Sequence, residues 1–500
     1  MKRTWRQRSL CWKGISMLTV VTPSEMSKLE NMAFQSGVSS LLLMENAAHA
    51  LVEELVGLLG SAEGKAVLFF CGSGNNGGDG LAAARLFYFL GGKASVCLSG
   101  EVKTPDALTN LKYAQALRLP IVQDPADLPV PDAVVDALLG TGLDRPPEGR
   151  AAELIDTINR YQVPVLCADV PSGFDAQTGQ AYDHCVKATR TVTFQFPKTG
   201  LYLTQSPDCV GELFVRDIGI PSDFYPQPSL TALEPWELHS RLPRRSRAAH
   251  KGSNGRVLIY AGSVGMAGAA GMAALACLRA GAGLVTIACR EELFPVLQAL
   301  VPGAQCQPIQ KVLKQAPAHD VLLAGCGLGQ EAAVWDNLMC LYDPALPTVM
   351  DADALNLLAK SPRMLGEKTI LTPHIGEAGR LLSWPLQAVM ASMPEAARTL
   401  YGKYGCIVAL KSHCSVITDG TRTALNTVGS PALAKGGSGD ALAGLMAGLL
   451  AQGMPPFEAA RTACLWLGKA GCMAEEKFGM HSTLTTDILS LLGDAAKVKN

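Results

Sequence analysis

The sequence predicts an α/β protein of two domains, each built on a mostly parallel sheet. Short apolar runs alternate with helical patterns in both halves, and a proline-rich, basic stretch separates them between about residues 220 and 256. Charged residues make up only 17% of the chain, while Gly 50 and Pro 30 exceed ordinary usage, which suits buried strands joined by tight turns. Because no period recurs along the 500 residues, a solenoid is excluded.

Charge and cysteine content limit the partners and the compartment. Lys+Arg 43 against Asp+Glu 44 gives a net charge of −1, so we expect no nucleic acid partner and no membrane partner. The 15 cysteines are scattered without a CxxC pair or zinc spacing, which is typical of core thiols in a reducing compartment. The apolar run over 262–284 is broken by glycines and predicts no transmembrane span. We therefore expect a cytoplasmic protein. We also expect the protein to be a homo-oligomer.

The first sixteen residues differ from the rest of the chain. They hold five Lys/Arg and no acid, and they lack the continuous apolar segment of a signal peptide. We expect a disordered basic extension over 1–16, or a start site misplaced ahead of Met17. The remaining chain is predicted to form one domain over 17–222, a linker or an edge strand over 223–250, and a second domain over 251–500.

The first domain is predicted to alternate helices and parallel strands. Apolar residues at helical spacing predict helices over 41–59 and 81–92. Short apolar runs that end in glycine, proline or a carboxylate predict strands over 65–70, 93–100, 132–140, 163–173 and 191–197. A parallel sheet with helices on both faces follows, and its ligand site is expected beyond the carboxyl ends of the strands.

The second domain is predicted to repeat this α/β pattern. A Gly/Ala-rich helix follows the first apolar run, and the last strong helix is predicted to open at 436–453. The series runs through the segments 257–263, 284–289, 320–329, 348–358, 368–382, 405–413 and 414–420. Two separate parallel-sheet domains are therefore expected rather than one large fold.

Polar side chains gather at three strand ends of the first domain. CGSGNNGGDG lies between a strand and a helix, where glycines let the backbone close on a phosphate, although a plain tight turn also explains the glycines. Because the carboxyl ends of parallel strands converge, we expect oxygens of Asn76, Asp136 and Ser172 to enclose a hard monovalent cation. Asp169 is left as a candidate acid or base.

The motifs NNGGDG, DALLGTG and DVPSG strongly resemble those of the NAD(P)H-hydrate epimerases over most of 17–221. The resemblance implies a Rossmann-like three-layer sandwich that binds potassium through Asn76, Asp136 and Ser172, and it places Asp169 against the reacting ring. It also implies that the hydrated nicotinamide dinucleotide contacts Asn75, Asn76, Gly77, Gly78, Asp79, Gly140, Thr141, Gly142, Leu143, Asp144, Arg145 and Pro146.

KGGSGDALAG, residues 435–444, is the most informative stretch of the second domain. A Gly-Gly-Ser-Gly turn entering a helix aims backbone N–H groups at one point, and Asp440 faces that point from the first helical positions. A carboxylate beside such an anion hole suggests deprotonation of a hydroxyl that attacks a phosphoryl group. An aspartate cap on a glycine turn is the alternative.

The GxGD pattern is similar to that of the ribokinase-like superfamily, and further segments over 250–492 resemble the ADP- or ATP-dependent NAD(P)H-hydrate dehydratases. Those segments include VMDADALN, LTPHIGEAGRLL and NTVGSPALAKGGSGDALAG. The resemblance implies that Ala267, Gly329, His374 and Asp440 contact the hydrated dinucleotide, with a core histidine as the alternative for His374. It implies that the adenine nucleotide is held by Lys411, Ser412, His413, Cys414, Ser415, Gly436, Gly437, Ser438 and Gly439.

Two positions depart from that pattern. Many relatives have glycine where Ser412 follows the lysine, and proline where Cys326 stands in GCGLG. Neither change removes a charged catalytic group, but Ser412 and His413 alter the expected contacts with the nucleotide.

The two resemblances together imply metabolite repair. Asp440 would take the proton of the ring hydroxyl, the hydroxyl would accept the terminal phosphoryl group, and the ring nitrogen would expel phosphate, with magnesium on the nucleotide. An epimerase beside the dehydratase makes both epimers of the hydrated dinucleotide repairable, because one chiral site handles one epimer. Fused members typically use ADP and give AMP and phosphate; a vitamin or sugar kinase fused to a dinucleotide-binding module is the alternative.

Overall fold

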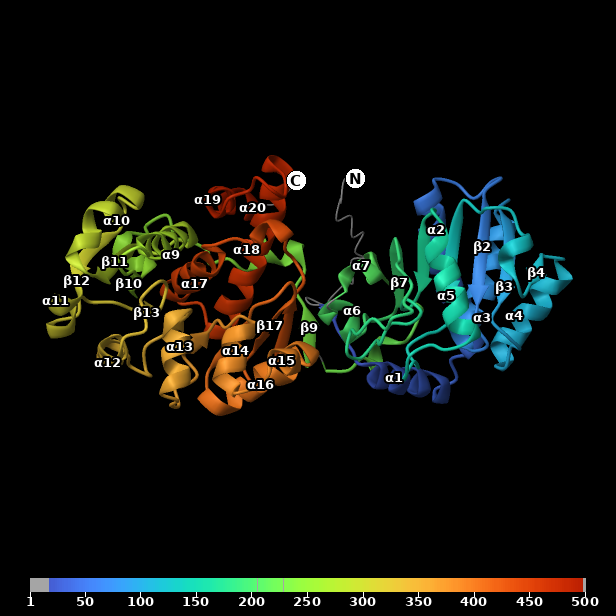
Figure 1. Cartoon of the computed structure of the whole chain (residues 1–500), viewed down its shortest axis with the longest axis horizontal. Coiled ribbons are helices and arrows are strands. Elements are labelled where there is room, and N and C mark those ends of the chain that lie inside the picture. Colours follow the sequence, from blue (N-terminus) through green and yellow to red (C-terminus); the bar gives the residue numbers. More distant parts are fainter. Residues whose placement is uncertain (1–17, 205, 228, 498–500) are drawn as a thin grey trace. The chain divides into compact units, whose positions relative to one another are not determined.

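The computed structural model describes residues 18–204, 206–227 and 229–497. The chain divides into two compact units, one over Thr19–Pro228 and one over Ser229–Asn500, and Figure 1 colours their elements along the sequence. The extension expected over 1–16 lies outside the described residues. A two-residue strand, β1 (Leu18–Thr19), comes first. Among the described helices, none is long and apolar enough to cross a membrane.

The first unit holds a seven-stranded parallel sheet in the order β4-β3-β2-β5-β6-β7-β8. Its strands are β2 (Ala66–Cys71), β3 (Lys93–Leu98), β4 (Ile121–Val122), β5 (Ala133–Ala137), β6 (Val165–Ala168), β7 (Arg190–Phe194) and β8 (Glu212–Arg216). Its helices are α1 (Pro23–Gln35), α2 (Ser40–Leu59), α3 (Asn75–Phe89), α4 (Pro105–Ala116), α5 (Arg150–Arg160), α6 (Thr199–Leu203) and α7 (Pro207–Val210).

Both faces of this sheet are buried, as the sequence predicts. Phe69 and Phe70 are neighbours on β2 and are both 0% exposed. Since successive strand residues point to opposite faces, they enter different cores. Phe69 packs with residues of α2 and α3 such as Leu51 and Leu81, whereas Phe70 packs with Ile155 and other residues of α5. The predicted three-layer α/β architecture is confirmed.

The second unit holds a larger sheet. From β9 onward, its strands lie side by side in the order β9-β18-β17-β16-β15-β14-β13-β10-β11-β12. Strands β10 to β16 pair in parallel, and β17 pairs antiparallel with both β16 and β18. The strands are β9 (Leu230–Ala232), β10 (Arg256–Tyr260), β11 (Leu284–Cys289), β12 (Gln305–Pro308), β13 (Val321–Ala324), β14 (Thr348–Met350), β15 (Thr369–Leu371), β16 (Ile407–Leu410), β17 (Ser415–Thr418) and β18 (Thr423–Asn426).

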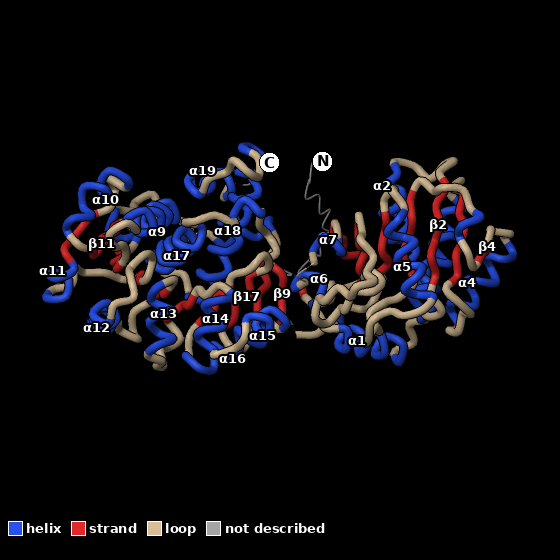
Figure 2. The backbone as a smooth tube through the Cα atoms, in the orientation of Figure 1, coloured by secondary structure: helices blue, strands red, loops and turns tan. Residues whose placement is uncertain are grey.

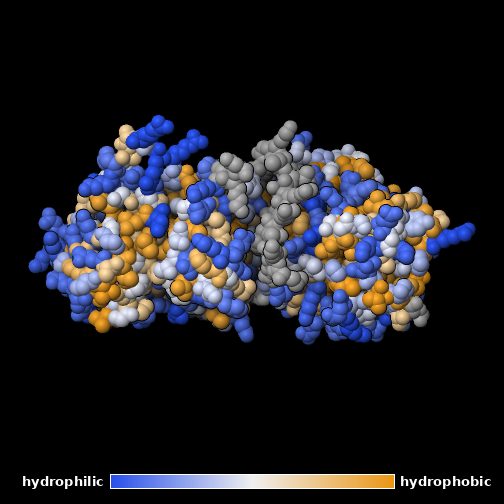
Figure 3. Space-filling model, turned by 90° about the horizontal axis from the view of Figure 1, so that it is seen from above, coloured by the Kyte–Doolittle hydropathy of each residue, from blue (hydrophilic) through white to orange (hydrophobic). Residues whose placement is uncertain are grey.

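Helices of very different length cover this sheet, as the tube in Figure 2 shows. They are α8 (Leu238–Arg241), α9 (Ala267–Ala280), α10 (Phe294–Leu300), α11 (Ile309–Lys314), α12 (Ala332–Leu341), α13 (Asp353–Lys360), α14 (Ile375–Leu382), α15 (Leu386–Ala391), α16 (Met393–Tyr404), α17 (Ser438–Ala451), α18 (Pro456–Phe478), α19 (Thr485–Ser490) and α20 (Leu492–Ala495). On the face shown in Figure 3, hydrophilic and hydrophobic residues are intermingled over both units.

Two features differ from the sequence-based expectations or refine them. The expectation that the last strong helix opens at 436–453 is wrong, because the 23-residue α18 follows it. Polar residues such as Arg461 and Thr462 are buried on α18, which obscures its apolar period. Over 223–250 the sequence allows either a linker or an edge strand. In the structure, β9 lies in this stretch, pairs with β18 and extends the sheet of the second unit.

Helices α9 and α17 pack closely because glycines face a neighbouring backbone. A Cβ atom added to Gly444 on α17 would lie 2.2 Å from the carbonyl oxygen of Ala273 on α9. A Cβ atom on Gly448 would lie 2.6 Å from the carbonyl oxygen of Cys277. Real side chains do not fit these gaps, so glycine allows the two helices to approach. This contact holds the middle of α17 against α9.

The substitution Gly444→Ala is expected to lower the free energy of unfolding by about 1–3 kcal/mol, because the added methyl group overlaps the Ala273 carbonyl. Denaturant unfolding of the whole chain measures this change. Gly268→Ala is the matched control, since open space surrounds Gly268 on α9, and helix propensity predicts a change between zero and a gain of about 1 kcal/mol. Equal stability losses in both variants would contradict the close approach.

Candidate active sites

The glycine-rich segment of the first unit begins a helix rather than forming a long loop. Asn75 to Gly80 make up the first turns of α3, and Gly74 is the N-cap residue. A Cβ atom on Gly77 would lie 2.0 Å from the carbonyl oxygen of Gly72, so the strand-to-helix turn requires glycine there. The sequence places Asn75, Asn76 and Asp79 in a loop ahead of a helix that starts at residue 81. This interpretation is wrong, because these three residues lie in the first turns of α3.

The side chains of Asn76, Asp136 and Ser172 meet around the peptide groups of Leu139. Asn76 Nδ2 donates to the Leu139 carbonyl oxygen at 3.1 Å, and the Leu139 N–H donates to Ser172 Oγ at 2.9 Å. Ser172 Oγ donates to Asp136 Oδ1 at 2.6 Å, and the Ser172 N–H donates to Asp136 Oδ2 at 2.8 Å. Three strand ends that are distant in sequence therefore converge, as the parallel sheet requires.

The donor set of this cluster fits a hard cation. The carbonyl oxygen of Leu139, the hydroxyl of Ser172 and the carboxylate of Asp136 lie together, with the Asn76 amide group against the same carbonyl, and alkali and alkaline-earth ions prefer such oxygen ligands. Asp136 is 0% exposed, and burial raises its pKa even though hydrogen bonds from Ser172, Leu138 and Cys167 act in the opposite direction. A positive ion near this carboxylate would compensate that burial.

Asp169 forms a buried ion pair that the sequence did not predict. Its backbone has a φ of 62°, and Lys198 Nζ donates to its Oδ1 atom. Thr193 Oγ1 also donates to Oδ1 at 2.9 Å, as does the Phe194 N–H at 3.1 Å. Lys198 is 1% exposed and donates further to Thr193 Oγ1 at 3.1 Å. The carboxylate is thus held in one orientation at the end of β6.

Two further carboxyl groups surround this pair. Burial raises the pKa of Glu30 on α1. Burial, reinforced by the nearby carboxylates of Asp169 and Glu30, raises the pKa of Asp79 well above its usual range. Sequence analysis missed Lys198 and Glu30. FQFPKTG offered one signal, since Lys198 follows the end of β7 at the same edge of the sheet as Asp169.

The loop over 140–146 follows β5 and reaches the same edge. Gly140 lies against Asn76, because a Cβ atom there would be 3.3 Å from that of Asn76. Thr141 and Leu143 are half-buried, while Gly142, Asp144, Arg145 and Pro146 are exposed. This exposed loop therefore lies next to the start of α3, and binding residues concentrate on such loops.

In the second unit, a lysine and an aspartate pair beside the Gly-Gly-Ser-Gly turn. Lys411 Nζ, after β16, donates to Asp351 Oδ1 at 2.6 Å, and Asp351, after β14, is 2% exposed. A Cβ atom on Gly439 would lie 3.4 Å from Lys411 Nζ and 3.5 Å from Asp351 Oδ2. Although burial lowers the pKa of Lys411, Asp351 and Glu377 more than offset it and raise that pKa overall. A fixed ammonium group therefore stands next to the turn.

Asp440 lies in the first turn of α17, close to Asp351 and Cys326. One ligand atom from each of these three residues lies within 4.8 Å of the others. Burial raises the pKa of Asp440, with a further contribution from the carboxylate of Asp351, while the Cys326 thiol and Lys411 lower it. A carboxylate with a raised pKa is a stronger base for a substrate hydroxyl than an ordinary exposed one.

The turn that precedes Asp440 is fixed from a neighbouring helix. Thr485 Oγ1, at the start of α19, donates to the Gly436 carbonyl oxygen at 3.0 Å and lies 3.4 Å from Ser438 Oγ. Gly437 has a φ of 91°, a conformation that favours glycine. The N–H groups at the start of α17 therefore lie beside Lys411. Together, these N–H groups and the ammonium group suit an anion.

His374 is an exposed N-cap residue and not a core histidine. Its Nδ1 atom accepts from the N–H groups of Gly376 at 3.0 Å and Glu377 at 3.3 Å. The backbones of His374 and Lys411 form an isolated parallel β-bridge. Partial burial of the imidazole, together with the charges of Lys411 and Arg380, lowers the pKa of His374. The neutral ring is therefore favoured, and it lies beside the lysine and aspartate pair.

The remaining predicted residues fall into two groups. Ala267 begins α9, and Gly327, in the loop that leads to Gly329, lies against Met266 at that helix start. The Gly329 N–H donates to Asp353 Oδ2 at 2.9 Å, which fixes this loop. Around Lys411, Ser412 Oγ lies 3.1 Å from His413 Nδ1, whereas Cys414 and Ser415 are 2% and 8% exposed. Side-chain contact of Cys414 with a nucleotide is therefore not supported by its burial.

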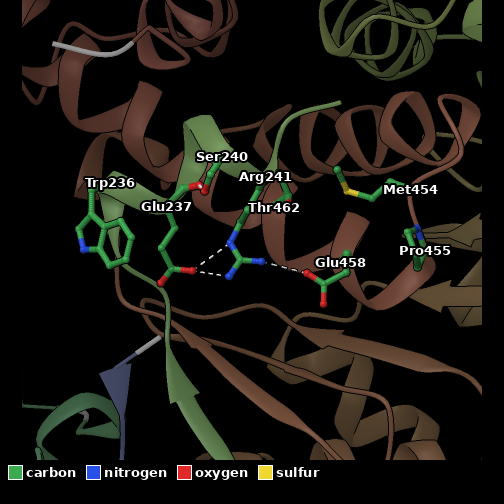
Figure 4. Close-up of a pocket in the computed structure, with 8 residues that line it drawn as sticks. All are labelled: Trp236, Glu237, Ser240, Arg241, Met454, Pro455, Glu458 and Thr462. Atoms are coloured by element: carbon green, nitrogen blue, oxygen red, sulfur yellow. Dashed lines mark hydrogen bonds and ion pairs between the residues drawn. The ribbon is translucent and has the colours of Figure 1, made fainter. Parts of the chain in front are cut away.

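A cavity of about 400 Å³ in the second unit is lined by other residues (Figure 4). Arg241 crosses it and donates to Glu237 Oε2 at 2.9 Å and to Glu458 Oε2 at 3.0 Å. Its wall is completed by Trp236, Ser240, Met454, Pro455 and Thr462. None of the predicted site residues lines this cavity, and its ion pairs connect α8 with α18.

Comparison with known proteins covers both units. The family described as NAD(P)H-hydrate dehydratase matches residues 257–493, and the family described as YjeF-related protein N-terminus matches residues 40–200. The bifunctional NAD(P)H-hydrate repair enzyme of Coxiella burnetii is 38% identical over 473 residues, which cover 93% of this chain and 96% of the relative. That of Escherichia coli K12 is 34% identical, covering 85% of this chain and 84% of the relative.

A solved structure resembles the second unit. The ADP/ATP-dependent NAD(P)H-hydrate dehydratase of Bacillus subtilis, co-crystallized with ATP/Mg2+, is 27% identical and covers 52% of this chain and 96% of its own, with a TM-score of 0.49. The curated relatives align along nearly the whole chain at more than 30% identity. The protein therefore belongs to the family of bifunctional NAD(P)H-hydrate repair enzymes, with an epimerase domain and a dehydratase domain.

Proposed function

We propose that the second unit dehydrates S-NAD(P)HX at the expense of ADP, giving NAD(P)H, AMP and phosphate, while the first unit interconverts the R and S epimers. One observation carries the dehydratase assignment: Asp440 stands in the first turn of α17, beside Asp351 and the Lys411 ammonium group. A base, a fixed cation and a row of N–H groups at one point are what phosphorylation of a hydroxyl requires.

The proposed dehydration converts a poor leaving group into a good one. Asp440 accepts the proton of the ring hydroxyl, which attacks the terminal phosphoryl group of ADP and releases AMP. The ring nitrogen then expels phosphate and becomes an iminium ion, and loss of a proton from the neighbouring ring carbon to solvent restores the dihydropyridine. Lys411 and the N–H groups after Gly436 stabilise the charge of the transferred group, and the neutral His374 contacts the dinucleotide.

Magnesium on the nucleotide phosphates would neutralise charge on the transferred group. We assign the adenine nucleotide to the loop after β16, where the Lys411 ammonium group and Ser412 lie. Many relatives have glycine at the position of the half-buried Ser412, which precedes the exposed His413. The hydroxyl and the imidazole of these two residues therefore provide additional polar contacts. The cytoplasmic location and the homo-oligomeric state expected from the sequence stay predictions.

In the first unit, Asp169 is proposed as the group that moves a proton at the ring hydroxyl during epimerisation. Lys198 positions its carboxylate from a fully buried site, and Thr193 supports the same oxygen. A potassium ion held by Asn76, Asp136 and Ser172 would supply positive charge at this site. The loop over 140–146 and the start of α3 would bind its phosphates and riboses.

The substitution Asp440→Asn is expected to lower the turnover of S-NADHX with ADP by about 10²–10⁴-fold, because the amide cannot accept the hydroxyl proton. Recovery of the NADH absorbance measures the turnover, and calorimetry measures ADP binding, which is expected to stay within a few-fold. Asp336→Asn makes the same chemical change at an exposed position on α12 and serves as the control. Unchanged turnover in Asp440→Asn would remove the proposed base.

The pH dependence of the dehydratase tests the same role independently. Asp440 acts as a base only when ionised, so activity is expected to rise with pH through its pKa and then level off. Because burial and Asp351 raise that pKa, the acidic limb of kcat/KM is expected above the usual range of an aspartate. A limb within the ordinary aspartate range would contradict this assignment.

For the first unit, Asp169→Asn is expected to abolish conversion of the R epimer while the S epimer is still dehydrated. Stereochemically resolved NADHX, followed by chromatography, distinguishes the two activities. Asp183→Asn changes an exposed aspartate of the same unit and is the control. Lys198→Gln is expected to slow epimerisation by at least about 10-fold by releasing Asp169 from its fixed orientation. Equal loss of both activities in Asp169→Asn would argue against independent sites.

A further inference from the structure

Cys326, Asp351 and Asp440 form a mixed thiol and carboxylate cluster in the second unit. They come from three elements that are distant in sequence: the loop after β13, the residue after β14 and the first turn of α17. One ligand atom of each lies within 4.8 Å of the other two. Cys326 is 0% exposed and Asp351 is 2% exposed, so these groups face the protein interior and one another.

We propose that Cys326, Asp351 and Asp440 bind a thiophilic divalent cation such as Zn²⁺, and that the bound ion blocks the dehydratase site. The binding part of this proposal stands on the geometry of the three side chains. The blocking part rests on the proposed function, in which Asp440 accepts a proton.

The distances suit zinc after small movements of the side chains. Zinc lies about 2.3 Å from a cysteine sulfur and about 2.0–2.2 Å from a carboxylate oxygen, so tetrahedral ligand atoms are about 3.5 Å apart. The observed upper limit of 4.8 Å therefore requires shifts on the order of 1 Å. Three protein ligands leave a fourth position open for water, and the partial exposure of Asp440 gives an ion a route to the cluster.

Asp351 can serve as a ligand without losing its lysine partner. Lys411 Nζ occupies Oδ1 at 2.6 Å, whereas Oδ2 lies on the side of Gly439, 3.5 Å from the position that a Cβ atom would take there. Binding breaks the S–H bond of Cys326, forms an S–Zn bond and releases the proton to the buffer. Two carboxylates, one thiolate and one ammonium then leave two negative charges, which a divalent cation neutralises.

The sulfur ligand selects the class of metal. Magnesium prefers octahedral oxygen ligands and retains several waters, so a buried thiol disfavours it. Thiolates favour zinc and related soft ions, and two carboxylates complete a donor set that these ions accept. A bound ion would occupy Asp440 and exclude the ring hydroxyl from it, so inhibition is expected to compete with the hydrated dinucleotide.

Metal binding is tested directly on the full, metal-free chain, without nucleotide or dinucleotide. Titration with Cd²⁺ is expected to give one sulfur-to-metal charge-transfer absorption per chain in the ultraviolet, and calorimetry with Zn²⁺ is expected to give a stoichiometry near one. Cys326→Ser and Cys326→Ala are expected to lose this absorption and to weaken Zn²⁺ binding by at least about 100-fold. Cys277→Ser changes another fully buried cysteine and is expected to retain both signals.

The outcomes separate this proposal from the proposed function. An absorption that persists in both Cys326 variants, or that disappears equally in Cys277→Ser, overturns the site. Absence of any absorption in the unaltered chain also overturns it. With binding established, Zn²⁺ is expected to lower the dehydratase rate of the unaltered chain at least about 10-fold relative to its own metal-free rate. A chelator is expected to reverse this inhibition, and epimerisation is expected to stay unaffected. Binding without inhibition would overturn the blocking role alone.

Discussion

Each half of the protein depends on a largely buried lysine and aspartate pair at the carboxyl edge of its sheet, with one partner of each pair fully buried. In the first unit Lys198 holds Asp169, and in the second unit Lys411 holds Asp351. Removal of one partner from such a pair leaves a buried charge without compensation and typically costs about 3–5 kcal/mol. Both pairs therefore constrain the loops that follow the strands, and the remaining polar groups are arranged around them.

The neighbours of each pair show how these charges prepare the sites. In the second unit, Lys411 lowers the pKa of His374 and acts against the burial that raises the pKa of Asp440. In the first unit, the carboxylate of Asp169 contributes to the raised pKa of Asp79, while Lys198 acts in the opposite direction. Burial and the charged pair beside each group therefore act together to set its pKa.

Much of the fold could be predicted because its signals are local. The apolar runs over 65–70, 132–140 and 163–173 became β2, β5 and β6, and each ends near a polar residue as expected. Local signals failed where burial contradicted them: Arg461 and Thr462 are buried on α18, and the polar start of α3 resembled a loop. Cys414 is expected at the nucleotide from its position in a motif, and local sequence does not show that its side chain is only 2% exposed.

The sequence by itself determined the α/β alternation, the two units, the glycine turns and the residues that end each strand, because these follow from local periodicity and backbone conformation. Only the tertiary structure decided which of those residues meet. Lys198 is 29 positions from Asp169, and Lys411 is 60 positions from Asp351. The order of strands in a sheet brings them together, and that order depends on how whole layers pack, which no local pattern records. The same packing brings α17 against the ends of β13 and β14, and so places the Asp440 carboxylate beside the Cys326 thiol.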